Sequence, residues 1–328
     1  MHDTALITGA SSGLGAEFAA QLAAQGHDVI LVARSGDRLA ALAQRLTAEH
    51  GVRTHVLAQD LAEPDAARRI ADQLTTRGLN VDLLVNNAGF GTCGRFEEIP
   101  AARDHDQLMV NVVALVDLTH EVLPGMLERG RGAIVNVASN AAFQPSPYFA
   151  VYGAAKTFVL NFGLALRQEY RRRGIRVLTL CPGPVETAFF DTIGTRNAAV
   201  TGSMTTPEPV VRAALRALER DRGYVAPGFS NALTAHLTPR RPRTLVAAIA
   251  ERITRKVLTP PGHRPLDRGG ARRMNSSAPP PSAPDSGIAM VRPWPAPPRR
   301  DQPVTETVQV LWQLEAETPL SRPLTFQR

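Results

Sequence analysis

The apolar positions of the first 234 residues fall into short runs separated by longer segments with helical spacing. The six apolar runs, each as long as a strand, cover residues 4–8, 28–33, 52–57, 81–85, 133–138 and 175–180. The helical segments cover residues 16–25, 65–77, 106–127 and 152–172, and a further helix over 207–221 precedes a seventh strand over 223–226. Apolar strands that alternate with helices predict an α/β fold with a doubly wound parallel sheet, whose ligands bind at the carboxyl ends of the strands.

A glycine-rich turn joins the first predicted strand to the first predicted helix. It consists of Gly9, Ala10, Ser11, Ser12, Gly13, Leu14 and Gly15. Glycines allow a tight turn and a close approach of the backbone to a pyrophosphate, whose charge is favoured by the N-terminus of a helix. The sequence therefore predicts that this turn binds a dinucleotide, although its spacing differs from the more widespread Gly-x-Gly-x-x-Gly.

The second predicted strand is followed by Arg34, with Arg38 one helical turn later. In dinucleotide folds this position reads the adenosine ribose: a carboxylate accepts the 2′-hydroxyl of NAD, whereas an arginine accommodates the 2′-phosphate of NADP. No carboxylate stands between this strand and Asp37. The pattern therefore favours NADP(H), and an exposed arginine at the start of a helix is the alternative.

Tyr152 and Lys156 lie four residues apart in a predicted helix, so both side chains can point at one reacting group. A neighbouring positive charge favours the tyrosine anion and would make the phenol usable as an acid and base near neutral pH. Only two of the 37 basic residues are lysines, Lys156 and Lys256, which indicates that an ammonium is needed at this internal position. The alternative is a half-buried aromatic beside a solvated charge.

Five motifs occur in order along the chain: the turn at residues 8–15, Asn86-Asn87-Ala88-Gly89, Ser139, Tyr152-Gly-Ala-Ala-Lys156 and Pro182-Gly183. Over residues 3–228 the chain therefore resembles the short-chain dehydrogenase/reductase family. The resemblance implies a Rossmann-type sheet of about seven strands and, with Arg34, a preference for NADP(H).

The resemblance also implies roles for single residues. Tyr152 would be the acid–base that protonates a carbonyl oxygen, Lys156 would bind the nicotinamide ribose and lower the tyrosine pKa, and Ser139 would hydrogen-bond the substrate oxygen. Asn111 would support a proton-relay water near the lysine, and capping or bending its own helix is the alternative. The other implied cofactor contacts are Asp60 and Leu61 at the adenine, Asn87, Ala88 and Gly89 beside the cofactor, and Pro182, Gly183 and Thr187 at the nicotinamide carboxamide.

Composition argues against several other classes of protein. No uninterrupted apolar run reaches the ~18 residues of a membrane span, and the first apolar strand begins within four residues, so we expect no secretory signal and a cytoplasmic location. Cys93 and Cys181 have no metal-ligand spacing, so we expect packing roles for them and no bound metal. Residues 1–234 carry 22 basic and 23 acidic residues, so the net charge of +7 lies beyond them, which weakens a nucleic-acid interpretation.

The motifs above belong to a first predicted domain, residues 1–234. Three other segments have features of their own, one inside this domain and two after it. Residues 189–206 suit a mobile substrate lid. Residues 235–258 carry 6 basic residues and 1 acidic residue, and within them 240–258 predict an amphipathic helix on which Leu245, Ile249, Ile253 and Val257 recur every four residues. This helix could cover the substrate entrance or contact another subunit; attachment to an anionic membrane and nucleic-acid contact are the alternatives. Residues 259–328 hold 14 of the 26 prolines and predict a tail of low order.

Together these features predict an NADP(H)-dependent oxidoreductase that interconverts a carbonyl and an alcohol, on a hydrophobic small-molecule substrate. The family resemblance further implies a homo-oligomer. There are two alternatives. One is a catalytically silent NADP(H) sensor, and the other is a membrane- or partner-binding protein that acts through residues 240–328. The intact Ser139, Tyr152 and Lys156 argue against the sensor.

Overall fold

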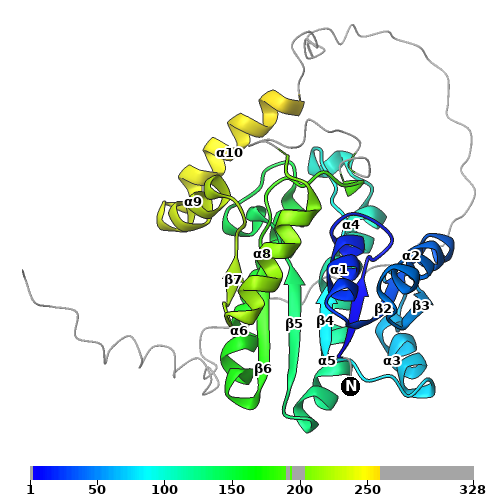
Figure 1. Cartoon of the computed structure of the whole chain (residues 1–328). Helices are drawn as coiled ribbons and strands as arrows, with labels where there is room; N and C mark the ends of the chain where they lie inside the picture. Colours follow the sequence, from blue (N-terminus) through cyan, green and yellow to red (C-terminus); the bar gives the residue numbers. More distant parts are fainter. Residues whose placement is uncertain (1–2, 190–192, 194–203, 259–328) are drawn as a thin grey trace, which may run out of the picture. The chain divides into compact units, whose positions relative to one another are not determined.

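The predicted strands form one parallel sheet in the computed structural model, which describes residues 3–189, 193 and 204–258 (Figure 1). Its strands are β1 (Thr4–Thr8), β2 (Asp28–Ala33), β3 (Thr54–Ala58), β4 (Leu83–Asn86), β5 (Gly132–Val137), β6 (Ile175–Leu180) and β7 (Tyr224–Val225). Their order across the sheet is β3-β2-β1-β4-β5-β6-β7. The order reverses between β1 and β4, and this reversal opens a crevice at the carboxyl ends of the strands, where such sheets bind ligands.

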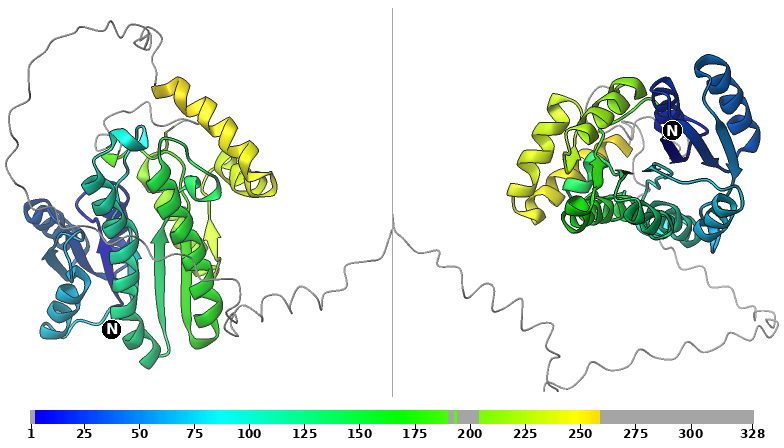
Figure 2. Two further views of the ribbon diagram at one scale, coloured as in Figure 1. Left: turned by 180° about the vertical axis from the view of Figure 1, so that it is seen from behind. Right: turned by 60° about the horizontal axis from the view of Figure 1, so that its bottom comes forward.

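Helices cover both faces of the sheet (Figure 1 and Figure 2). One layer contains α1 (Gly13–Ala24), α2 (Gly36–His50) and α8 (Pro207–Glu219), and the other contains α3 (Ala66–Thr76), α5 (Ala114–Glu128) and α6 (Ala150–Tyr170). Successive residues of a strand point to opposite faces, so Ile30 and Leu31 are both 0% exposed and pack into different layers. Burial on both faces explains why the central strands are mainly apolar rather than alternating, whereas the edge strand β3 is only partly buried.

The remaining described elements lie mainly around the carboxyl edge of the sheet. They are η1 (Phe96–Glu98), α4 (Ala101–Leu108), η2 (Met109–Val113), η3 (Asn140–Phe143), η4 (Arg171–Arg173), α9 (Phe229–Leu237), η6 (Thr238–Arg240) and α10 (Arg243–Leu258). Figure 1 shows α9 and α10 in yellow beyond the end of β7.

The structure departs from the predicted elements in several places. Helix α2 has no counterpart among the predicted ranges, and β4 begins at Leu83 rather than at residue 81. The helix predicted over 106–127 is divided into α4, a π-helical turn (η2) and α5. The short helix α9 was not predicted, and β3 begins at Thr54 rather than at residue 52. The helix predicted over 240–258 is observed as α10. Most of the predicted lid and the whole predicted tail lie outside the described residues.

In the part of the chain that the structure describes, one helical stretch, Ala101–Glu128, contains an 18-residue window apolar enough to cross a membrane, judged by length and composition alone. In the fold this stretch is α4, η2 and α5, and α5 buries Leu118 and Met126 against the sheet and α3. Core helices of globular domains have the same composition, so the stretch is weak support for a membrane span.

Candidate active site

A cavity of about 860 Å³ runs along the carboxyl ends of the strands and brings most of the predicted site residues together. All the predicted catalytic and cofactor residues line it except Gly15 and Asn111, which lie just behind its wall. The lining set is Gly9, Ser11, Ser12, Gly13, Leu14, Arg34, Arg38, Asp60, Leu61, Asn87, Ala88, Gly89, Ser139, Tyr152, Lys156, Pro182, Gly183 and Thr187.

The glycine-rich turn passes so close to neighbouring residues that side chains at Gly13 and Gly15 would collide with them. Gly13 has φ +56°, and a Cβ there would lie 2.9 Å from Thr187 Cγ2 on the opposite wall of the cavity. A Cβ on Gly15 would lie 2.5 Å from Asn87 Nδ2. Helix α1 begins at Gly13, and among the described residues no side chain caps its first amides. These amides face the cavity as hydrogen-bond donors suited to a phosphate.

The far end of the cavity lies beside the ends of β2 and β3. Arg34 Nη1 is 3.9 Å from Asp60 Oδ2, and the Arg34 side chain is 77% exposed. Asp60 is held in place because its Oδ1 accepts a hydrogen bond of 3.0 Å from Ala62 N. Arg38 is exposed and lines the same end. Two guanidinium groups therefore stand where the predicted adenosine ribose would lie.

Thr8 fastens the loop after β4 to the glycine-rich turn, a role that sequence reasoning did not assign to it. Its Oγ1 accepts hydrogen bonds of 2.9 Å from Asn87 N and from Ala88 N. Asn87 Nδ2 in turn donates to Thr8 O at 2.8 Å. The two loops that face the predicted dinucleotide are thus held as one unit.

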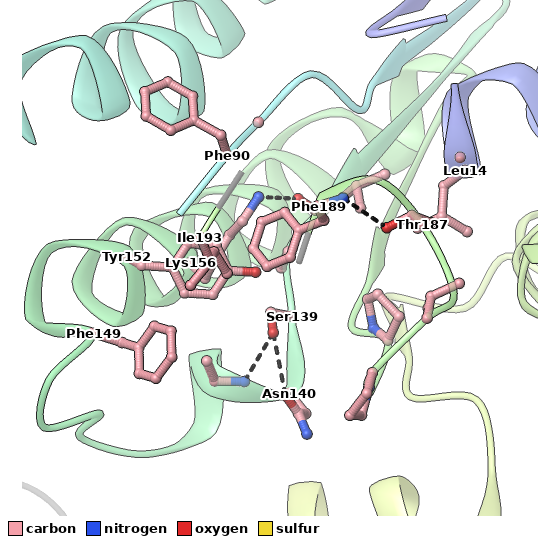
Figure 3. Close-up of a pocket in the computed structure, with 18 of the residues that line it drawn as sticks. Leu14, Phe90, Ser139, Asn140, Phe149, Tyr152, Lys156, Thr187, Phe189 and Ile193 are labelled. Atoms are coloured by element: carbon pink, nitrogen blue, oxygen red, sulfur yellow. Dashed lines mark hydrogen bonds between the residues drawn. The ribbon is translucent and has the colours of Figure 1, made fainter. Parts of the chain in front are cut away.

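Ser139 and Tyr152 approach each other at the centre of the cavity (Figure 3). Ser139 ends the β5 segment and precedes η3, where its Oγ accepts a hydrogen bond of 3.2 Å from Ala141 N. Burial raises the pKa of Tyr152 to about 12, and a hydrogen bond from Ser139 opposes that rise. Burial and the Ser139 hydrogen bond are the causes of this shift, so the lowering of the tyrosine pKa by Lys156 stays a prediction. The phenol is protonated at neutral pH.

Lys156 lies one helical turn beyond Tyr152 and is only 4% exposed. Its Nζ donates a hydrogen bond of 2.8 Å to Val137 O, at the end of β5, and lies 5.8 Å from the centre of the Tyr152 ring. Burial lowers the pKa of Lys156 to about 8. The ammonium is thus held between α6 and the sheet, in a space that fits a compact point charge.

Asn111 sits in the π-helical turn η2, and its side chain clamps the loop after β4. Its Oδ1 accepts from Phe90 N at 3.1 Å and its Nδ2 donates to Phe90 O at 2.9 Å. A Cβ on Gly89 would lie 2.8 Å from Asn111 Oδ1 and 3.4 Å from Lys156 Nζ, so the three residues meet at one point. The helix is locally rewound at this residue, whose side chain does not cap the helix, and its part in a water relay stays a prediction.

The side of the cavity next to Tyr152 has an apolar wall. Phe149 contributes to this wall, as do Phe189 and Ile193 from the first residues of the predicted lid. The rings of Tyr152 and Phe189 lie 5.4 Å apart (Figure 3). Helices α9 and α10 complete this wall with Leu237, Val246, Ala250, Ile249 and Ile253. Sequence reasoning named α10 as one candidate cover for the entrance but missed α9.

A tyrosine two residues before α6 connects α10 to the site. Tyr148 has φ +66°, a conformation rare for a bulky residue. Its hydroxyl donates a hydrogen bond of 3.2 Å to Glu251 Oε1 on α10. Tyr148 therefore fixes the cover helix to the segment that leads into Tyr152.

The two cysteines do not suit a nucleophilic role. Burial raises the pKa of Cys93 to about 11 and that of Cys181 to about 12, so both are neutral thiols. Among the residues that the structure describes, no cluster of side chains could hold a metal ion.

The sheet order, the glycine-rich turn and the cavity define a dinucleotide-binding protein of the Rossmann class. Residues 3–198 match the short chain dehydrogenase family, and the chain belongs to this family of oxidoreductases.

Three similar proteins illustrate the relationship. The chain is 39% identical over 191 residues to sulfoacetaldehyde reductase 2 of Chromohalobacter salexigens, a match that covers 58% of this chain and 75% of the relative. It is 31% identical over 247 residues to the human very-long-chain 3-oxoacyl-CoA reductase, covering 72% of this chain and 76% of the relative. A short-chain dehydrogenase from Sphingobium yanoikuyae in complex with NADPH has a TM-score of 0.66 and 31% identity, covering 80% of this chain and 99% of that chain.

Proposed function

We propose that this protein is an NADPH-dependent reductase that converts a bulky, apolar ketone or aldehyde to the alcohol. The observation that carries the proposal is the single cavity that holds Ser139, Tyr152 and Lys156 at its centre, the glycine-rich turn along one wall and two exposed arginines at one end. The predicted roles of all these residues are part of the proposal.

The residues present fit a nicotinamide dinucleotide phosphate. The glycine-rich turn would hold the pyrophosphate, because its Cβ-free backbone and the uncapped amides of α1 favour a close anionic group. Arg34 and Arg38 would hold the 2′-phosphate, and Lys156 would hold the nicotinamide ribose. The cofactor supplies a hydride to the carbonyl carbon when it is bound.

The chain's own residues would handle the oxygen of the substrate. Negative charge develops on this oxygen during reduction, and the hydroxyls of Ser139 and Tyr152 can both donate hydrogen bonds to it. Tyr152 would then transfer its proton, because its pKa of about 12 keeps the phenol protonated at neutral pH. Lys156 would stabilise the resulting phenolate from the same helix face.

The apolar wall supports a bulky substrate. The side chains that face the Ser139–Tyr152 pair from α9, α10 and the lid end are mainly apolar. One relative is named for very-long-chain 3-oxoacyl-CoA and another for sulfoacetaldehyde, so the named carbonyl substrates of relatives differ widely in size. The shape and chemistry of this cavity favour a large carbonyl substrate.

The catalytic part of the proposal is tested by Tyr152→Phe. We expect turnover of apolar ketones with NADPH to fall at least ~100-fold, the lower bound for the loss of a general acid, while the NADPH dissociation constant changes little. Tyr170→Phe, which removes a surface hydroxyl outside the cavity, is the matched control. Loss of less than about tenfold would contradict the assigned role of Tyr152.

The cofactor preference is tested by Arg34→Ala with both cofactors. A charge-assisted arginine–phosphate contact is worth roughly 1.5–3 kcal/mol, so NADPH affinity should fall about 10- to 150-fold and NADH affinity should stay constant. Arg45→Ala on the outer side of α2 is the control, since Arg45 pairs with Glu49. Equal affinity of the wild type for NADPH and NADH, measured by calorimetry, would refute the preference.

Cytoplasmic location and self-association are further parts of the proposal. Light scattering on the purified full chain measures the oligomeric state directly, and fractionation of cells that express it measures the location. A monomer at micromolar concentration would contradict the family-based expectation of a homo-oligomer.

A further inference from the structure

The exposed apolar side chains of the described residues are concentrated on α9 and α10. Of eleven large apolar side chains that are exposed, six lie on these two helices. They are Phe229 (85% exposed), Leu233 (45%), Leu237 (43%), Leu245 (52%), Ile249 (51%) and Ile253 (40%). Scattered exposed apolar residues are ordinary, but a contiguous set marks a binding surface.

The three apolar residues on α9 have the same spacing as the three on α10, and both groups of three lead into the same cavity. Each set occupies positions i, i+4 and i+8 of its helix, so it winds slowly around the helix surface. On α9 the outer end is Phe229 and the inner end, Leu237, lines the active-site cavity. On α10 the outer end is Leu245, whereas Ile249 and Ile253 line the cavity. An apolar path therefore runs from the protein surface to the catalytic site.

Exposed arginines lie on the same part of the chain, in η6, in the turn after it and along α10. They are Arg240, Arg241, Arg243, Arg252 and Arg255, and residues 235–258 carry only one acidic residue, Glu251. Arg252 lies only about 20° from Leu245 around α10, at about 100° per residue. Glu251 is already engaged by Tyr148 and by Arg255, 3.4 Å away. We call these six apolar residues and five arginines the α9–α10 face.

We propose that the α9–α10 face docks on an anionic lipid bilayer, with its apolar side chains entering the interface and its arginines contacting lipid phosphates. Exposed apolar residues flanked by arginines are the chemistry that a membrane interface selects. The mouth of the cavity then opens toward the acyl chains, from which an apolar substrate can enter without crossing water.

Charge argues against the two other occupants of this face. A symmetric contact with a second copy would place the same five arginines against themselves. The C-terminal segment, residues 259–328, carries 9 basic and 6 acidic residues, so it is not complementary to a basic surface either.

Vesicle flotation of the full-length wild type tests the proposal. Vesicles of pure phosphatidylcholine are compared with vesicles that contain about one third phosphatidylglycerol, whose surface potential attracts basic residues. We expect the protein to float with the anionic vesicles only, and to be released by salt, because surface charges are screened at high ionic strength.

Two double variants locate the contact. Phe229→Gln with Leu245→Gln removes the outer apolar ends and should weaken partition at least tenfold. Arg243→Gln with Arg252→Gln should weaken it about fivefold for each arginine. The control for the apolar variant is Phe158→Gln on α6, which removes an exposed apolar residue elsewhere. The control for the arginine variant is Arg45→Gln on α2 with Arg68→Gln on α3, which removes two exposed arginines elsewhere.

The outcomes separate this proposal from its rivals and from the proposed function. Absence of anionic-vesicle binding, or binding that both α9–α10 variants retain, would overturn it. A wild-type oligomer that dissociates in the Phe229→Gln, Leu245→Gln variant would assign the face to a second copy instead. None of the substituted residues is assigned a part in catalysis, so each variant should turn over a water-soluble ketone as fast as the wild type when no vesicles are present. If the wild type turns over no carbonyl at all, the proposed reductase function fails, but the vesicle result still stands.

Discussion

Replacing Lys156 by methionine should make the protein more stable at neutral pH while it abolishes activity. The ammonium lies in a nearly dry site, and burial lowers its pKa from an ordinary value of 10.5 to about 8. Each tenfold change in proton affinity corresponds to about 1.4 kcal/mol. Holding this lysine charged in the folded state at pH 7 therefore costs about 3 kcal/mol of stability.

The substitution also removes a hydrogen bond, which offsets part of the gain. Lys156 Nζ donates to Val137 O at 2.8 Å, and such a bond contributes about 1 kcal/mol. Methionine has a similar length and packs well in apolar surroundings. The expected net result at pH 7 is a free energy of unfolding about 2 kcal/mol higher for Lys156→Met than for the wild type.

The pH dependence of this difference identifies its cause. Between pH 8 and 10.5 the unfolded chain holds the proton of Lys156 and the folded chain does not, so wild-type stability rises with pH in this window. The advantage of Lys156→Met should therefore disappear by about pH 10. Urea unfolding of the apo proteins at several pH values measures it, with Lys256→Met as the control. A variant that is less stable at pH 7, or a difference that does not change with pH, would refute the reasoning.

Two further substitutions test the supports of the site. Asn111→Leu leaves both backbone groups of Phe90 unpaired, so we expect a loss of about 3 kcal/mol in urea unfolding. An unchanged free energy of unfolding would disprove the clamp. Tyr148→Phe breaks the hydrogen bond to Glu251 and loosens α10, so KM for a bulky ketone should rise about fivefold with kcat nearly constant; a fall in kcat at constant KM would show that Tyr148 acts elsewhere.

The sheet was predictable from the sequence because its strands are buried on both faces. Residues 29–33 are continuously apolar between Asp28 and Arg34, so the limits of this strand are visible without tertiary information. The break at Asn111 was not predictable, since its π-helical turn accompanies hydrogen bonds to Phe90, 21 residues away in the chain. Helix α9 was missed because its apolar residues face outward and do not produce the pattern of a core helix.

The candidate site was predictable to the extent that it is made of local motifs. The glycine-rich turn and the Tyr152–Lys156 pair carry their geometry in their own spacing. The apolar wall depends on where α9 and α10 pack, which the sequence leaves open. The direction of the Tyr152 pKa shift depends on how much of the cavity is shielded from water, and residue spacing carries no information about this shielding.

The scarcity of lysine gives this protein an intrinsic chemical probe of its catalytic cavity. Amine-directed reagents react with the unprotonated form, and with a pKa of about 8 a large share of Lys156 has lost its proton in mildly alkaline buffer. The chain has only one other side-chain amine, at Lys256 in α10, so peptide mapping needs to separate Lys156 only from Lys256 and the α-amino group. Peptide mapping after brief labelling therefore reports whether the cavity is filled: a ligand that covers Lys156 protects it, and an open cavity leaves it to be modified.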